Sequence, residues 1–196
     1  SSTLISILSY TMNLPNIITI ARLQLTPYIV WLILSENYVL GFIFFLISGV
    51  SDALDGFIAK KFNQQTLLGS YLDPIADKFL IVSSIVLLGY NGYVPIWLII
   101  IIVSRDIAIL GAVIISWMLG TNLRIEPLII SKINTFLQIF YIVITFMVIL
   151  NNQTLNELTI SIHGITTYLI AISTILSWIS YLKVWLINVN SVNKNY

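Results

Sequence analysis

Residues 51–78 read SDALDGFIAKKFNQQTLLGSYLDPIADK and place charged residues between two long apolar runs. This stretch holds half of the acidic residues of the chain, namely Asp52, Asp55, Asp73 and Asp77. The apolar runs on both sides predict a membrane, where a carboxylate is costly to bury. Charged residues that are kept in such surroundings usually have a function, so we take this stretch as the first candidate for a functional site.

The composition is typical of a polytopic membrane protein. Of the 196 residues, 58% are hydrophobic and 9% are charged. A soluble domain of this length cannot hide so large an apolar fraction in one core. The sequence has no cysteine, which excludes disulfides and thiolate chemistry. The net charge of +1 gives no indication of a nucleic-acid partner.

Six apolar runs have about the 20 residues that a membrane-spanning helix needs. They cover approximately residues 17–34, 38–62, 67–90, 94–119, 130–150 and 158–187, and Asn91-Gly92 is expected to form a tight turn. A shorter apolar segment, residues 4–12, is expected to lie along the membrane interface. The sequence therefore predicts an all-α integral membrane protein with six transmembrane helices and a short N-terminal interfacial helix. No linker or repeat is evident, so residues 1–196 are expected to form a single domain.

Basic residues are distributed unevenly among the connections between these runs. The connections near 35–37, 91–93 and 151–157 contain no Lys or Arg. The alternate connections, the helix ends beside them and the C-terminal tail carry Lys60, Lys61, Arg124, Lys132, Lys183 and Lys194. Because basic residues collect on the cytoplasmic side, both termini and the four aspartates are expected to be cytoplasmic.

The spacing of the aspartates predicts that they meet. Asp52 and Asp55 are three residues apart, and Asp73 and Asp77 are four apart, so each pair lies on one face of its helix. A short connection makes the two helices antiparallel neighbours, so the pairs can face each other. Unpaired carboxylates so close together would repel each other, and hard divalent cations resolve the repulsion.

Carboxylate oxygens suit Mg²⁺ or Mn²⁺, and two such ions can hold a pyrophosphate and orient an attacking hydroxyl. One carboxylate can then act as a general base. Three small residues on the same helices, Gly56, Ala59 and Gly69, would let a ligand approach the backbone. Taken singly, each of the three is better explained by close helix packing in a membrane.

The pattern D-x2-D-G-x2-A-x9-G-x3-D-x3-D resembles the signature of the CDP-alcohol phosphotransferases. Seven of its eight positions match, filled by Asp52, Asp55, Gly56, Ala59, Gly69, Asp73 and Asp77. The eighth differs, because Lys60 stands where the family usually has Arg and cannot grip a phosphate in a bidentate way. Residues 13–16, Asn-Leu-Pro-Asn, followed by Thr19, Arg22 and Pro27, resemble the phosphatidylglycerophosphate and cardiolipin synthase branch of the family.

The resemblance implies a reaction and a set of roles. The donor would be CDP-diacylglycerol, CMP would leave, and two Mg²⁺ or Mn²⁺ ions would bridge the pyrophosphate. It implies that all four aspartates bind metal and that Asp77 is also the general base. Gly56, Ala59 and Gly69 would line the donor pocket, with further donor contacts from Asn16, Thr19 and Lys60. It also implies a homodimer in a membrane of the bacterial or mitochondrial inner membrane type.

The acceptor depends on cations outside the signature. Glycerol 3-phosphate carries a phosphomonoester, so several Arg or Lys side chains would favour its binding, whereas phosphatidylglycerol needs fewer. Arg105 lies within an apolar run without a second Arg after it, and Asp106 is not expected to share its helix face. Arg105 and Lys132 are the candidate acceptor-binding residues, and we favour phosphatidylglycerol, with glycerol 3-phosphate as the alternative. An interhelical ion pair of Arg105 and anchoring of Lys132 to headgroups explain them as well.

Two other classes of protein stay open at this point. A cation transporter also places aspartates in the membrane, but it is expected to have broken helices in two corresponding halves, which this sequence lacks. A purely structural membrane protein predicts that Asp77→Asn has no effect on any lipid product.

Overall fold

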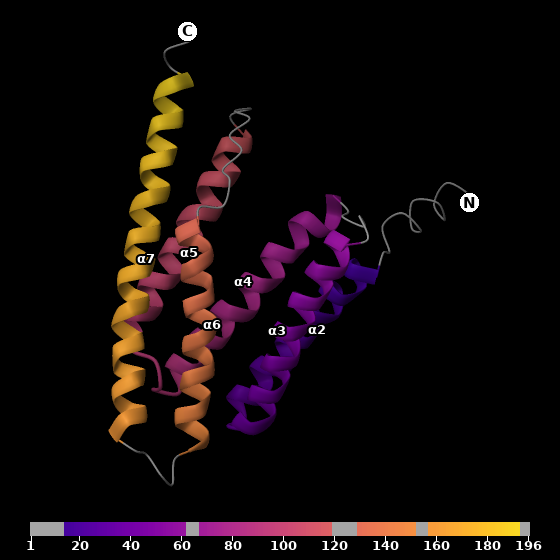
Figure 1. The fold of residues 1–196 in the computed structure, drawn as a ribbon, viewed down its shortest axis with the longest axis vertical. Helices are drawn as coiled ribbons and strands as arrows, with labels where there is room; N and C mark the ends of the chain where they lie inside the picture. The colour runs from indigo at the N-terminus through magenta and orange to yellow at the C-terminus, as the bar shows by residue number, and fades with distance from the viewer. Residues whose placement is uncertain (1–13, 62–66, 119–128, 152–156, 193–196) are drawn as a thin grey trace, which may run out of the picture. The chain divides into compact units, whose positions relative to one another are not determined.

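The computed structural model describes residues 14–61, 67–118, 129–151 and 157–192, and every regular element in these ranges is an α-helix. The helices, drawn in Figure 1, are α2 (Leu14–Leu34), α3 (Tyr38–Lys61), α4 (Leu67–Tyr90), α5 (Ile96–Met118), α6 (Ile129–Leu150) and α7 (Glu157–Val192). They confirm the six predicted helices to within a few residues at each end. The predicted interfacial helix over residues 4–12 lies outside the described residues.

The chain divides into two compact units, Ser1–Asn91 and Gly92–Tyr196. In the first unit α2 packs against both α3 and α4, and in the second unit α7 packs against both α5 and α6. Each unit is therefore built around one helix that contacts the two others. The prediction that residues 1–196 form a single domain stays a prediction.

A tight turn joins α2 to α3 and caps the end of α2. The amide of Asn37 donates to the carbonyl of Leu32 at 2.9 Å, and the amide of Glu36 donates to the carbonyl of Ile33 at 3.1 Å. These two bonds are those of a Schellman motif, which satisfies the last carbonyl groups of a helix. The motif needs a left-handed residue, and here Glu36 adopts it with a φ of 58°. Glutamate carries strain in this conformation that glycine would not.

Replacement of Glu36 by glycine is therefore expected to raise the free energy of unfolding by about 1 kcal/mol. Thermal unfolding of the purified protein in detergent measures the change. Glu36→Gln is the matched control, because it removes the charge and keeps the strained conformation, and its unfolding temperature should stay at that of the unaltered protein. A glycine variant less stable than the glutamine variant would contradict the assignment of strain to this turn.

Asn91 fixes the end of α4 to the turn between α2 and α3. Its side-chain Nδ2 donates to the carbonyl oxygen of Ile33 at 3.2 Å and to the hydroxyl of Tyr38 at 3.1 Å. The end of α4 therefore lies beside the end of α2 and the start of α3, so α3 runs antiparallel to the other two (Figure 1). The C-terminal half of α3 and the N-terminal half of α4 consequently lie together at the other end of this unit. The predicted Asn91-Gly92 turn is confirmed, with a φ of 84° at Gly92.

Aromatic and aliphatic side chains fill the space between the helices of the first unit. Phe45 of α3 is buried together with Ile29 of α2 and Ile85 of α4. Next to Phe45 in the sequence, the ring of Phe44 meets the ring of Tyr28 edge to face, with 5.2 Å between the centroids. This packing holds α2 at the centre of the unit, where its polar residues reach both neighbours.

Polar residues line the contact between α6 and α7 in the second unit. The Thr145 hydroxyl on α6 lies 3.1 Å from Nε2 of His163 on α7, and the Thr167 hydroxyl donates to that of Tyr141 at 3.1 Å. The rings of Tyr141 and His163 also stack, with 4.9 Å between their centroids. Side-chain hydrogen bonds of this kind hold helices together in lipid, where the hydrophobic effect does not favour their association. His163 thus belongs to the packing of this unit.

Two stretches of the described helices, Ile129–Leu150 and Ile160–Trp185, are long and apolar enough to cross a membrane. Ile18–Leu34 and Tyr38–Asp52 are shorter apolar stretches within α2 and α3. The six helices of the described ranges match the six predicted long helices, while six membrane crossings stay a prediction.

Candidate active site

One arginine joins two of the predicted aspartates across three helices. Arg22 of α2 forms ion pairs through its Nη1 atom with Oδ1 of Asp52 on α3 and with Oδ1 of Asp77 on α4. The side chain of Arg22 is 1% exposed, whereas those of Asp52 and Asp77 are 36% and 35% exposed. The guanidinium is therefore enclosed by the helices, and both carboxylates are open to a ligand from one side.

The pairing follows from electrostatics. A buried arginine requires counter-charges, because an isolated guanidinium loses its hydration on burial. Two carboxylates drawn to the same nitrogen would repel each other without that positive charge. The guanidinium of Arg22 therefore allows the two carboxylates to lie close together, and the carboxylates allow the guanidinium to be buried. The structure brings Asp52 and Asp77 together, and their roles as metal ligands stay a prediction.

The other signature residues lie on the same two helices. α3 carries Asp55, Gly56, Ala59 and Lys60, and α4 carries Gly69 and Asp73, but the side chains of these residues lie outside the described part. Among the residues that the structure does describe, no group of three or more His, Cys, Asp or Glu could hold a metal ion. The described side chains include only two of the four aspartates, so the predicted metal set stays untested.

The two predicted donor contacts on α2 lie N-terminal to Arg22. Thr19 is one turn before Arg22 and is 2% exposed, so it faces the interior of the unit as Arg22 does. Asn16 is a further turn away, and its side chain lies outside the described part. Their contacts with a donor stay a prediction.

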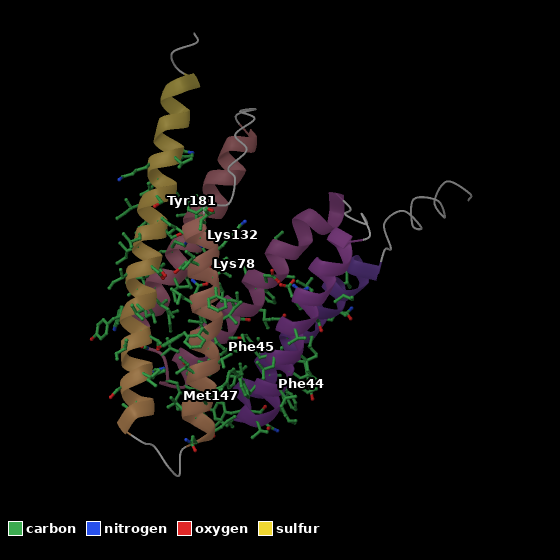
Figure 2. The ribbon with its side chains drawn as sticks, viewed as in Figure 1. Phe44, Phe45, Lys78, Lys132, Met147 and Tyr181 are labelled. Atoms are coloured by element: carbon green, nitrogen blue, oxygen red, sulfur yellow. The ribbon has the colours of Figure 1, made fainter. Side chains whose placement is uncertain are left out.

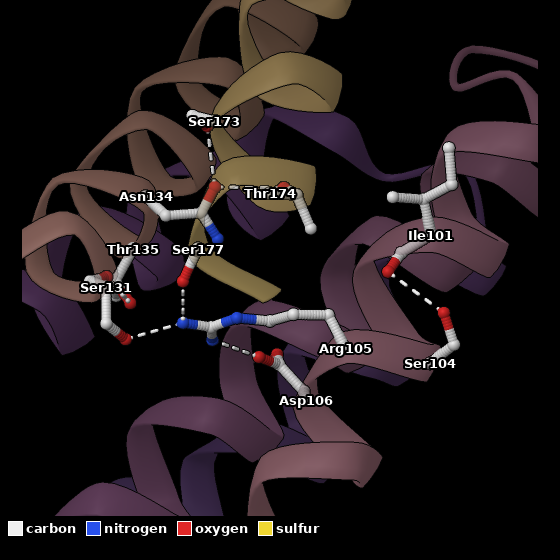
Figure 3. A network of polar contacts seen from close by, with 10 residues as sticks. All are labelled: Ile101, Ser104, Arg105, Asp106, Ser131, Asn134, Thr135, Ser173, Thr174 and Ser177. Carbon is white, nitrogen blue, oxygen red and sulfur yellow. Dashed lines mark hydrogen bonds and ion pairs between the residues drawn. The ribbon is translucent and has the colours of Figure 1, made fainter. Parts of the chain in front are cut away.

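Arg105 lies at the centre of a hydrogen-bonded network in the second unit (Figure 3). Its Nη2 atom donates to the hydroxyl of Ser131 on α6 at 2.5 Å and to that of Ser177 on α7 at 2.6 Å. Its Nη1 atom lies 2.6 Å from Oδ1 of Asp106 on its own helix. The guanidinium also lies over the ring of Tyr181, 5.6 Å from its centroid. Arg105 is 1% exposed, so its partners enclose it completely.

The ion pair between Arg105 and Asp106 was not predicted from the sequence. Neighbouring residues on a helix project about 100° apart, which led us to place Asp106 on a different face. The arginine side chain is long enough to bend around the helix, so both groups meet although their Cβ atoms diverge. The sequence left open an ion pair of Arg105 with another helix, and the described ion pair is within α5.

Lys132, the other predicted acceptor residue, differs from Arg105 in its exposure. It follows Ser131 on α6 and its side chain is exposed (Figure 2). Asn134, which lies one turn after Ser131 on α6, is buried, and its Oδ1 accepts hydrogen bonds from Ser173 and Thr174 of α7 at 2.7 and 2.9 Å. The network around Arg105 thus continues along α6 on the buried face, while Lys132 lies on another.

Sequence reasoning noted Arg22 only as part of a resemblance and gave it no role. The signal was available, because an arginine in the middle of an apolar run of membrane length is itself a candidate functional residue. The same argument was applied to Arg105. The hydroxyl partners Ser131 and Ser177 had no comparable signal, since serine is common where membrane helices pack closely.

A family model described as CDP-alcohol phosphatidyltransferase matches residues 12–187. The chain belongs to this family. The match extends over all the described helices, from the N-terminal part of α2 to the C-terminal part of α7. It therefore includes the aspartate-bearing helices and the network around Arg105, so both clusters lie within the phosphatidyltransferase family's own domain.

Curated members of this phosphatidyltransferase family carry two kinds of name. A Drosophila melanogaster protein named probable cardiolipin synthase (CMP-forming) is 35% identical over 144 residues, which are 65% of this chain and 45% of the relative. The CDP-diacylglycerol–glycerol-3-phosphate 3-phosphatidyltransferase 1, chloroplastic, of Oryza sativa subsp. japonica is 32% identical over 187 residues, 87% of this chain and 56% of the relative. The chain spans about half the length of these two relatives.

A bacterial relative matches over a larger share of its own length. The CDP-diacylglycerol–glycerol-3-phosphate 3-phosphatidyltransferase of Bacillus subtilis (strain 168) is 32% identical over 142 residues, which are 65% of this chain and 72% of the relative. The similarity to both kinds of phosphatidyltransferase is of the same order, so percentage identity does not distinguish between the two acceptors.

The divalent metal that this family generally uses is compatible with the chain's own residues. Carboxylate oxygens are the ligands that Mg²⁺ and Mn²⁺ prefer, and the two described aspartates come together from separate helices. Asp55 lies one turn after Asp52 on α3, and Asp73 one turn before Asp77 on α4. The helix register thus places two carboxylate-bearing positions on neighbouring turns of each helix, which makes four in all.

Proposed function

We propose that this chain is a membrane-bound phosphatidyltransferase that moves a phosphatidyl group from CDP-diacylglycerol to an acceptor hydroxyl and releases CMP. The observation that carries the proposal is the meeting of Asp52 and Asp77, two residues of the signature, at the single guanidinium of Arg22. Both carboxylates are partly exposed, so a ligand can reach them. Membership of the family supplies the reaction type.

The reaction needs one proton acceptor. The acceptor hydroxyl oxygen forms a bond to the phosphorus attached to diacylglycerol, and the bond from that phosphorus to the oxygen of CMP breaks. The bonding electrons leave with CMP, and the hydroxyl proton passes to the carboxylate of Asp77. Phosphoryl transfer depends mainly on positioning and charge neutralisation, so the chain needs no covalent nucleophile.

The four aspartates, Asp52, Asp55, Asp73 and Asp77, would hold two Mg²⁺ or Mn²⁺ ions. Bound there, the ions would offset the negative charge on the pyrophosphate and on the departing CMP. The small residues Gly56, Ala59 and Gly69 would leave room for the donor beside the helix backbones. Lys60, Asn16 and Thr19 would add contacts to its polar groups.

Phosphatidylglycerol is the acceptor that the second unit favours. Asp106 lies 2.6 Å from Arg105 and offsets its charge, so Arg105 offers less attraction to a doubly charged phosphomonoester. Lys132 is exposed and carries one positive charge, which suffices for a phosphodiester. Glycerol 3-phosphate is the second candidate, because two of the relatives are named for transfer to it.

The surface of the described helices supports a location in a bilayer. Large apolar side chains face outward on both units, among them Trp31 at 57% exposed, Ile96 at 70% and Phe136 at 67%. Patches of this extent are uncommon on soluble monomers. We propose six crossings, both termini and the aspartates on the cytoplasmic side, and a homodimer of the bacterial or mitochondrial inner membrane type.

The proposed function is tested by reconstituting the purified protein in vesicles with CDP-diacylglycerol and Mn²⁺ or Mg²⁺. Phosphatidylglycerol and glycerol 3-phosphate are offered separately, and the lipid product and CMP are both measured. Cardiolipin formed with one CMP per transfer is the expected result. Formation of phosphatidylglycerophosphate alone would show that glycerol 3-phosphate is the acceptor, and the proposed transfer reaction would still hold. Release of CMP that depends on neither acceptor nor metal would overturn the mechanism.

A further inference from the structure

We propose that Arg22 is a positioning residue of the aspartate site: it sets the separation of the Asp52 and Asp77 carboxylates and supplies the positive charge that lets them approach before a cation binds. The inference rests on the proposed function and deepens it, because it concerns the same site. It assigns a role to an arginine for which the sequence indicated none.

The carboxylates of Asp52 and Asp77 share a single nitrogen atom of Arg22. Nη1 of Arg22 contacts Oδ1 of Asp52 and Oδ1 of Asp77, so one donor atom is shared by carboxylates from two different helices. Any movement of α3 or α4 away from α2 lengthens one of these contacts. The position of Arg22 on the central helix of the unit therefore fixes both carboxylates relative to each other.

Burial makes this arrangement obligatory. Arg22 is 2% exposed, so water cannot replace the carboxylates as partners of its guanidinium. Thr26, one turn later on the same helix, is fully buried, and its hydroxyl donates to the carbonyl oxygen of Arg22 at 3.0 Å. The backbone at Arg22 is thus also held in place. A surface arginine would move between partners, whereas this one has a fixed location.

The charge of Arg22 is expected to raise the stability of the metal-free protein and to lower its affinity for a divalent cation. It stabilises the metal-free protein, since it offsets the repulsion between the carboxylates. It weakens the binding of a divalent cation at those carboxylates, because like charges repel at short range in a medium of low dielectric constant. Removal of Arg22 should therefore destabilise the metal-free protein and tighten cation binding. An arginine that only filled space would not produce these opposite signs.

The test uses Arg22→Gln, Asp52→Asn and the double variant, each purified in detergent as the full chain. In EDTA, Asp52→Asn should change the unfolding temperature much less in the Arg22→Gln background than in the unaltered protein. Titration with Mn²⁺, followed by electron paramagnetic resonance, should show binding to Arg22→Gln that is about tenfold or more tighter than to the unaltered protein. Arg22→Lys keeps the charge, so its Mn²⁺ affinity should stay within about threefold of the original.

Arg105→Gln is the matched control, because it removes a second fully buried arginine that is also paired with an aspartate. It should lower the unfolding temperature and leave the Mn²⁺ affinity unchanged. If Arg22→Gln does not fold in EDTA, Arg22→Lys decides the question, because it keeps the charge: a folded Arg22→Lys supports the need for a positive charge at this position, and an Arg22→Lys that also fails to fold contradicts it. Additive effects of the two substitutions on unfolding in EDTA, or weaker Mn²⁺ binding to Arg22→Gln, would overturn the role of Arg22.

The two proposals fail in different ways. An unaltered protein that makes no lipid from CDP-diacylglycerol defeats the proposed function, and the cycle in EDTA still decides the role of Arg22. Lipid synthesis by the unaltered protein together with additive effects in EDTA defeats the role of Arg22 alone.

Discussion

Replacement of Asp77 by asparagine is expected to lower the rate of phosphatidyl transfer by about 10³-fold or more. The amide can neither accept the proton of the attacking hydroxyl nor carry the negative charge that a cation requires. Loss of a general base alone typically costs about 10²–10⁴ in rate. Arg22 keeps its contact with Asp52 in this variant, so the first unit should retain a counter-charge for its buried arginine. The measurement is the initial rate of CMP and lipid formation in vesicles.

Glu36→Gln is the control for Asp77→Asn, since it makes the same chemical change at an exposed carboxylate in the turn between α2 and α3. It should leave the rate unchanged. Thermal unfolding of both variants separates a loss of chemistry from a loss of fold. A rate near that of the unaltered protein in well-folded Asp77→Asn would remove Asp77 from the mechanism and favour a structural role for the aspartates.

Removal of divalent cations is the second change with a large expected effect. Dialysis against EDTA should reduce lipid formation to less than about 1% of the starting rate, because the pyrophosphate and the carboxylates would then repel each other. Addition of Mg²⁺ or Mn²⁺ should restore the rate. Asp52→Asn should need about tenfold more Mn²⁺ for half of its own maximal rate, since one charged oxygen ligand is lost.

The unfolding temperature in EDTA shows whether the protein remains folded during this experiment. Arg22 lies between Asp52 and Asp77 and offsets their charges, so the metal-free protein should remain folded. Full lipid synthesis in EDTA, with residual metal excluded by elemental analysis, would show that the carboxylates act without cations.

The positions of the helices could be predicted from the sequence because each apolar run is close to one membrane thickness and ends at polar or turn-forming residues. The Asn91-Gly92 turn was predictable for a similar reason, since glycine readily adopts the positive φ that Gly92 has. The turn at Glu36 was not, because glutamate gives no local signal for a left-handed conformation. There the bonds that cap α2 determine the conformation and override the preference of the residue.

The aspartate site could be predicted in part. Spacing predicted that Asp52 shares a helix face with Asp55 and that Asp73 shares one with Asp77, but spacing says nothing of a third helix. The role of α2 depends on Arg22, whose partners lie 30 and 55 residues away in the sequence and are found only when the helices pack. The pairing of Arg105 with Asp106 was missed for a different reason, because helix-face geometry describes where a side chain starts and not how far it reaches.

Arg105 obtains its hydroxyl partners from helices that are synthesised after its own. Ser131 lies on α6 and Ser177 near the middle of α7, so neither has been added to the chain when the synthesis of α5 is complete. Until then the guanidinium has Asp106 beside it, and a helix that carries these two charges enters lipid alone only at a cost of several kcal/mol. With the proposed six crossings, α5 is therefore expected to enter the bilayer together with α6 and α7 and not alone.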